Sequence, residues 1–160
     1  MWIVVACVGL VARDTWADKP KATDARAAFE AWQKTVSQKQ DAAIAGMGVP
    51  FRVAAYKDAN ELACDLTISD RAKLVDAYKC IVDANVNFID LKPYSKKLLG
   101  DLGQLSSFKA EIEKLDKTTV MYGKYERGEG MSVFTIVAIG ADPADHKPRV
   151  VAVYAWTVLT

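Results

Sequence analysis

The C-terminal third of the chain carries the clearest hydrophobic pattern. Three segments rich in β-branched and aromatic residues, 119–126, 131–139 and 149–159, are separated by polar links that contain glycine or proline. Such segments are typical of strands, and successive strands joined by turns form an antiparallel meander. Because the last two segments are apolar on both faces, we expect this sheet to be covered on both sides or to curl around an interior.

Helical periodicity dominates the first half of the chain. Between residues 25 and 36 the apolar residues recur at steps of three and four positions, which predicts a helix with one buried face. A shorter helix is expected over 41–47, where glycine and proline then interrupt the pattern. The segments 51–56 and 62–68 predict a hairpin, and residues 70–82 predict another helix whose apolar side chains share one face.

The central stretch, residues 88–116, predicts mostly helix, interrupted by Pro93, Gly100 and Gly103. No internal repeat, low-complexity tract or long linker divides the chain. We therefore expect residues 18–160 to form a single α+β domain, in which a curved antiparallel sheet packs against N-terminal and central helices.

The N-terminal segment, residues 1–17, differs in kind from the rest. An uninterrupted apolar run over 2–12 is followed by a short polar stretch and by a small residue at Ala17. This order is typical of a secretory signal, and the run is too short to cross a bilayer comfortably. We expect cleavage after Ala17 and an exported product, periplasmic or secreted, without stable membrane insertion. The alternatives are a buried first strand and, less expected because the apolar run continues beyond it, lipidation at Cys7.

The cysteines fit export. If Cys7 leaves with the signal, Cys64 and Cys80 remain, an even number that suits an oxidising compartment. We expect them to form a disulfide, whose loop of about seventeen residues would contribute roughly 3 kcal/mol in the loop-entropy model. The alternative is a pair of reduced, buried thiols. The only histidine, His146, lies in a polar loop, and two cysteines alone are too few ligands for zinc, so we expect no metal site. We expect no other cofactor either.

The charge balance limits the classes of partner. Lysine and arginine total 21 against 20 aspartates and glutamates, a net charge of +1. Such a balance provides no field to attract nucleic acid or an anionic membrane surface. The lysines between residues 92 and 117 interleave with acids, which indicates a solvated face. The partners that remain are a small apolar molecule, another protein, or a second copy of this chain bound through the sheet.

Three stretches carry a resemblance to a known fold, residues 40–45 (QDAAIA), 49–53 (VPFRV) and 149–154 (RVVAVY). With the expected order of elements over most of 22–159, they resemble the nuclear-transport-factor-2-like superfamily, in which helices wrap a curved sheet into a cone. A cystatin-like layout of one helix on an antiparallel sheet is the nearest rival, and the several helices expected before residue 116 count against it. The resemblance implies no single function, because the fold hosts isomerases, dehydratases, hydrolases and binding modules.

Enzymes of that superfamily usually place Asp, His or Tyr inside the cone, whereas this chain has no His in any predicted strand or helix. Acid–base chemistry would therefore rest on a carboxylate or a phenol. The residues of these types near predicted sheet or pocket elements are Asp65, Asp90, Tyr56, Tyr122, Tyr125 and Tyr154. The catalytic candidates are Asp90, Tyr122 and Tyr154. Asp90 is flanked by apolar residues that would desolvate its carboxylate, and the alternative is an Asp that turns the chain before Pro93.

Aromatic residues supply the candidates for ligand binding. Tyr154 and Trp156 share one face of the last predicted strand, and with Tyr56 they would line a cavity with apolar rings and polar tips. The alternative is that they belong to the core. No nucleophile or phosphate-loop motif is present. We therefore expect a non-enzymatic binding module, with a small isomerase, dehydratase or hydrolase that uses Asp90 and a tyrosine as the alternative.

Overall fold

Six strands and the helices that flank them make up the described part of the chain. The computed structural model describes residues 18–58, 61–102 and 107–159, so the expected signal segment and its Cys7 lie outside it. The helices are α1 (Ala22–Thr35), α2 (Gln40–Ala45), the 3-10 turn η1 (Arg71–Lys73), α3 (Leu74–Asp83), α4 (Lys96–Leu102) and α5 (Lys109–Asp116). The strands are β1 (Met47–Tyr56), β2 (Leu62–Ile68), β3 (Lys92–Pro93), β4 (Val120–Arg127), β5 (Met131–Ala141) and β6 (Pro148–Leu159).

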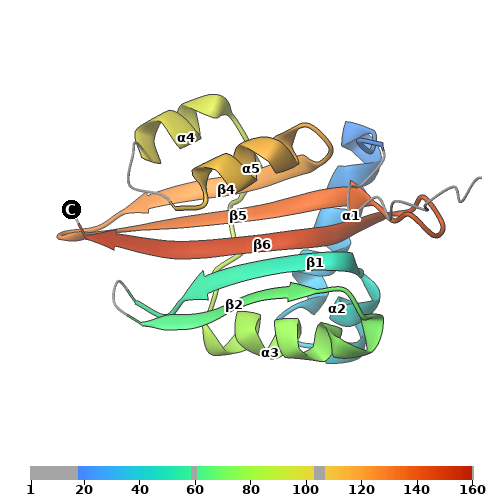
Figure 1. Cartoon of the computed structure of the whole chain (residues 1–160). Coiled ribbons are helices and arrows are strands. Elements are labelled where there is room, and N and C mark those ends of the chain that lie inside the picture. The colour runs from blue at the N-terminus through green and yellow to red at the C-terminus, as the bar shows by residue number, and fades with distance from the viewer. Residues whose placement is uncertain (1–17, 59–60, 103–106, 160) are drawn as a thin grey trace, which may run out of the picture.

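The strands form one curved sheet in the order β2-β1-β6-β5-β4-β3 (Figure 1). The last three, β4, β5 and β6, make the predicted antiparallel meander. The predicted hairpin is β1 with β2. It joins the meander through parallel pairing of β1 with β6, where Val53 lies beside Val153. The N-terminal hairpin and the C-terminal strand therefore meet in the middle of a mixed sheet.

The helices follow the predicted spacing of apolar residues. In α1, the side chains of Ala25, Phe29 and Trp32 are buried against the sheet, which confirms the helix expected there. The turn η1 leads into α3, and the Asp70 carboxylate accepts a hydrogen bond of 3.0 Å from the Ala72 N–H at its start. This is the usual role of an aspartate at a helix N-cap.

Two segments differ from the expectation. The strand β1 begins at Met47 rather than at Phe51, so Gly48 and Pro50 lie inside a strand. The pairing of β1 with β6 is interrupted between Met47 and Arg52. Pro50 therefore lies where the β1–β6 pairing requires no backbone N–H, the group that proline lacks. The stretch 88–116, expected to be mostly helical, also contains β3, which pairs with β4 at the edge of the sheet.

Both faces of the sheet are covered, as the apolar strands predicted. One face packs against α1, α2 and α3, where Phe29 stacks on Tyr122 with ring centroids 4.5 Å apart. The opposite face packs against α4 and α5, where Phe108 contacts Trp156 at 5.9 Å. Figure 1 shows α5 and α1 on opposite sides of the sheet. The result is an α+β fold with a curved, cone-like sheet.

Close packing of α4 on the sheet depends on Gly123 in β4. A Cβ atom at this position would lie 3.1 Å from both the Leu98 side chain and the Thr135 carbonyl oxygen. Gly100 in α4 differs, since a Cβ there would meet nothing within 4 Å. At Gly123 there is therefore no room for a side chain, whereas at Gly100 there is.

A disulfide between Cys64 and Cys80 joins β2 to α3. The two Cα atoms lie 5.9 Å apart, within the usual span of such a bridge. This confirms the predicted pairing, and it is compatible with an exported protein. Within the described residues, no helix is long and apolar enough to cross a membrane.

Candidate functional site

A groove of about 590 Å³ opens on the face of the sheet that carries α4 and α5. Its walls are α5 and the residues that directly follow it on one side, and the strands β1, β2 and β6 on the other. The lining residues are Pro50, Phe51, Arg52, Thr67, Glu111, Lys114, Leu115, Lys117, Thr118, Val151 and Tyr154. This volume is within the range of sites that hold small molecules.

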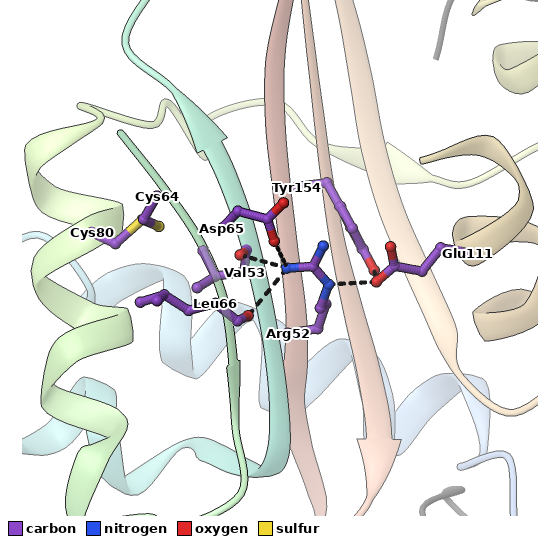
Figure 2. A network of polar contacts seen from close by, with 8 residues as sticks. All are labelled: Arg52, Val53, Cys64, Asp65, Leu66, Cys80, Glu111 and Tyr154. Atoms are coloured by element: carbon purple, nitrogen blue, oxygen red, sulfur yellow. Dashed lines mark hydrogen bonds and ion pairs between the residues drawn. A yellow bond between two sulfur atoms is a disulfide. The ribbon is translucent and has the colours of Figure 1, made fainter. Parts of the chain in front are cut away.

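Arg52 lies on the sheet wall of this groove because of strand alternation. Its neighbours Phe51 and Val53 point into the core under α1 and α3, so the side chain between them points to the opposite face. There the Arg52 Nε donates a hydrogen bond of 2.6 Å to Glu111 Oε1 of α5. Its Nη1 forms an ion pair with Asp65 of β2 (Figure 2).

The same guanidinium also donates to the main chain. The Arg52 Nη1 lies 3.0 Å from the Val53 carbonyl oxygen and 3.2 Å from that of Leu66. Burial alone would lower the pKa of Arg52, but the hydrogen bonds that Arg52 donates to the Glu111 and Asp65 carboxylates, together with their negative charges, outweigh burial and raise the pKa above its ordinary value. Arg52 is therefore a fixed cation that connects β1, β2 and α5.

Tyr154 completes this cluster from β6. Its hydroxyl donates a hydrogen bond of 2.7 Å to Glu111 Oε1, and its ring centroid lies 6.0 Å from the Arg52 guanidinium carbon. The residue is fully buried. Burial and the adjacent Glu111 carboxylate raise the pKa of Tyr154 well above its ordinary value, so the phenol stays protonated as a donor.

Two polar atoms of Arg52 and Glu111, residues that line the groove, are without a hydrogen-bond partner in the described part of the chain. Within residues 18–58, 61–102 and 107–159, Arg52 Nη2 donates to no acceptor and Glu111 Oε2 accepts from no donor. One groove wall thus offers a hydrogen-bond donor and an acceptor next to each other. Pro50, Leu115 and Val151 supply apolar surface beside them. Such a site can orient a molecule with an apolar body and a polar end.

The three residues proposed for ligand binding have different positions. Tyr154 lines the groove, as described. Trp156 shares its face of β6 but packs against Phe108 and Phe134, with a ring centroid separation of 5.2 Å to the latter. Tyr56 is half-buried and packs on the same core. Only Tyr154 among these three lines the groove.

The three catalytic candidates are not brought together. Tyr122 is buried on the opposite face of the sheet, stacked on Phe29. Asp90 is exposed, with φ 61°, in the turn before β3, and it borders a separate surface hollow with Tyr125. The desolvation expected for the Asp90 carboxylate is therefore not found, and its position matches the alternative of a turn residue.

The sequence did not single out Arg52 or Glu111. The available signal for Arg52 was its place in a predicted strand between two apolar residues, which is unusual for a solvated charge. Glu111 gave no comparable signal, because it alternates with lysines on α5. Its pairing with Arg52 follows from the fold alone.

A metal centre finds no support in the described part of the chain, where no group of three or more His, Cys, Asp or Glu side chains is placed to hold an ion. His146 lies in the polar turn between β5 and β6, with φ 59°. Nearby, Arg149 forms ion pairs with Asp142 at 2.9 Å and Asp145 at 2.6 Å. These ion pairs connect the turn to the start of β6.

No protein-family model matches this chain, and neither the curated proteins nor the solved structures contain a match to it.

Proposed function

We propose that this chain is an exported, non-enzymatic binding module that holds a small, largely apolar molecule in the groove between α5 and the sheet. The observation that carries the proposal is the polar cluster of Arg52, Glu111 and Tyr154 on the wall of an otherwise largely apolar groove. The apolar N-terminal run and the disulfide between Cys64 and Cys80 support export.

The cluster is organised before any ligand arrives. Arg52 is held by two carboxylates and two main-chain carbonyl oxygens, and Glu111 Oε1 accepts two hydrogen bonds. Side chains that are already fixed lose little conformational entropy on binding. The groove therefore suits recognition of a molecule without movement of the sheet.

The usual interior of a cone-like fold is a less suitable site in this chain. The face under α1 and α3 is filled by aromatic contacts, Phe29 with Tyr122 and Trp32 with Phe88, the latter at 5.0 Å. We propose the nuclear-transport-factor-2-like relationship on the basis of element order and sheet curvature, and we place the binding surface of this chain on the face of the sheet opposite to α1 and α3.

The alternative of a small isomerase, dehydratase or hydrolase has weaker support. It requires a carboxylate and a phenol that act on one substrate, whereas Asp90 borders one hollow and Tyr154 another. Tyr122 belongs to the core on the far side of the sheet. A binding role requires no such convergence.

A fluorescence titration with the neutral probe N-phenyl-1-naphthylamine tests the proposal. We would compare the native chain with Thr67→Trp, which places a bulky ring on the exposed β2 wall of the groove. The matched control is Thr23→Trp, an exposed position on α1 across the sheet. We expect Thr67→Trp to bind the probe about tenfold more weakly than the native chain, because the new ring fills the space that the probe needs. Thr23→Trp should bind the probe as the native chain does. Equal dissociation constants for all three proteins would contradict the proposal.

A further inference from the structure

Two positive charges in the groove take part in no polar contact within the described part of the chain. Lys114 and Lys117 line its α5 side, and in the described part of the chain neither ammonium group has a hydrogen-bond or ion-pair partner. They are three positions apart, so they lie on the same side of the helix end, where like charges repel.

The nearby acids do not neutralise these lysines. Glu111 lies one turn before Lys114, at a spacing that suits an ion pair. Its carboxylate instead accepts from Arg52 and Tyr154. Asp65 is likewise paired with Arg52. Among the charged groups that line the groove, together with Asp65, three cations, Arg52 and the two lysines, stand against two anions, an excess of one positive charge.

We infer that the groove selects molecules that carry one carboxylate on an apolar body, a step that rests on the proposed binding function. The carboxylate would accept from Arg52 Nη2 and from the Lys114 and Lys117 ammonium groups. The apolar body would lie along Pro50 and Val151. Hydrogen bonds between charged partners are stronger than neutral ones, so the acid end sets the orientation.

The same charges argue for a monoanion over a phosphate dianion. A single excess positive charge is balanced by one carboxylate. The second negative charge of a dianion would be left unbalanced near Glu111 and Asp65, whose charges are fixed next to Arg52. Arg52 offers only Nη2, because Nε and Nη1 are already engaged, so it supplies a single-atom contact to a bound anion rather than a two-pronged one.

Isothermal titration with decanoate and decanol, below the concentration at which decanoate forms micelles, tests the inference. The two probes share one apolar chain and differ in the charge of the polar end. We expect decanoate to bind about tenfold more tightly than decanol, which corresponds to one charge-assisted contact. We also expect the affinity for decanoate, and not for decanol, to fall as salt is raised.

The variant Lys114→Gln/Lys117→Gln isolates the lysines. It should bind decanol as the native chain does and lose the preference for decanoate. The matched control is Lys34→Gln/Lys39→Gln, which removes the same charge from exposed positions near α1. Equal affinity of the native chain for the two probes would overturn the carboxylate inference and leave the binding function standing. Binding of neither probe would overturn both, and an unchanged preference in the Lys114 and Lys117 variant would overturn the assigned residues.

Discussion

The hydroxyl of Tyr154 and the carboxylate of Glu111 are joined by a hydrogen bond of 2.7 Å, which links the central strand β6 to the helix α5. The same Glu111 oxygen accepts from Arg52 at 2.6 Å. One carboxylate therefore fixes both the position of α5 on the sheet and the geometry of the groove wall. Stability and binding are thus coupled at this point.

Tyr154→Phe should lower the free energy of unfolding. The substitution keeps the ring and removes the donor to a charged acceptor, and hydrogen bonds to charged groups contribute about 1.5–3 kcal/mol. The loss is to be measured as a shift of the urea midpoint without a change of slope. A midpoint equal to that of the native chain would show that Glu111 replaces this hydrogen bond at no cost.

Tyr94→Phe is the opposite case. The Tyr94 hydroxyl is buried and has no hydrogen-bond partner among the described residues. Its removal relieves a desolvated group, so the urea midpoint should stay the same or rise. A midpoint that falls as far as that of Tyr154→Phe would contradict the placement of this hydroxyl.

Tyr94 also gives the chain a pH dependence in the alkaline range. Burial, with the charges of Asp116 and Glu113, raises its pKa from 10.0 to about 12. The folded chain therefore keeps a proton that the unfolded chain releases, so this contribution to stability is complete below pH 10 and is lost as pH rises toward 12. The absorbance of ionised tyrosine can be followed as pH rises. In Tyr94→Phe, the titration step near pH 12 that belongs to this phenol in the native chain should be missing. Identical titrations for the two proteins would be inconsistent with the raised pKa.

Removal of the disulfide by Cys64→Ala/Cys80→Ala should cost about 2–4 kcal/mol, because the bridge restricts the unfolded chain. The reduced native chain serves as the comparison, since it lacks the bond but keeps both side chains. Cys64 is adjacent in β2 to Asp65, so we also expect weaker probe binding if the end of β2 moves. An unfolding free energy that does not change in either protein would mean that the bridge adds nothing to stability.

Gly123→Ala and Gly100→Ala should have opposite effects. At Gly123 the new methyl group would press on a backbone oxygen of β5, and overpacking of this kind costs about 1–3 kcal/mol. At Gly100 the methyl group meets nothing within 4 Å and lies in a helix, so a gain of about 0.5–1 kcal/mol is expected. Thermal unfolding of both variants provides the measurement. A loss at Gly100 as large as that at Gly123 would contradict the packing of α4.

Local patterns predicted the elements of this fold better than their arrangement. The β-branched runs of β4, β5 and β6 and the periodic apolar residues of α1 gave the correct structures, because burial of one or both faces imposes a period on the sequence. The parallel contact of β1 with β6 had no such signal. It depends on residues far apart in the chain, such as Val53 and Val153.

The candidate site shows the same limit. Tyr154 could be predicted, because an aromatic residue in a strand indicates buried apolar area with a polar tip. Lys114 and Lys117 were interpreted as part of a solvated face, since charges that alternate on a helix usually are. Their position beside a groove follows from where α5 docks. That docking depends on Glu111 and Arg52, which lie on different elements.

The parallel pairing of β1 with β6 also constrains how this protein reaches its native state. The β1–β2 hairpin can form early from neighbouring residues, but the centre of the sheet closes only after β6 has been synthesised. Folds dominated by such distant contacts reach their transition state slowly, in milliseconds to seconds. Before β6 pairs with β1, the chain has no complete core. An export pathway that requires an unfolded chain would act in the time before this pairing forms.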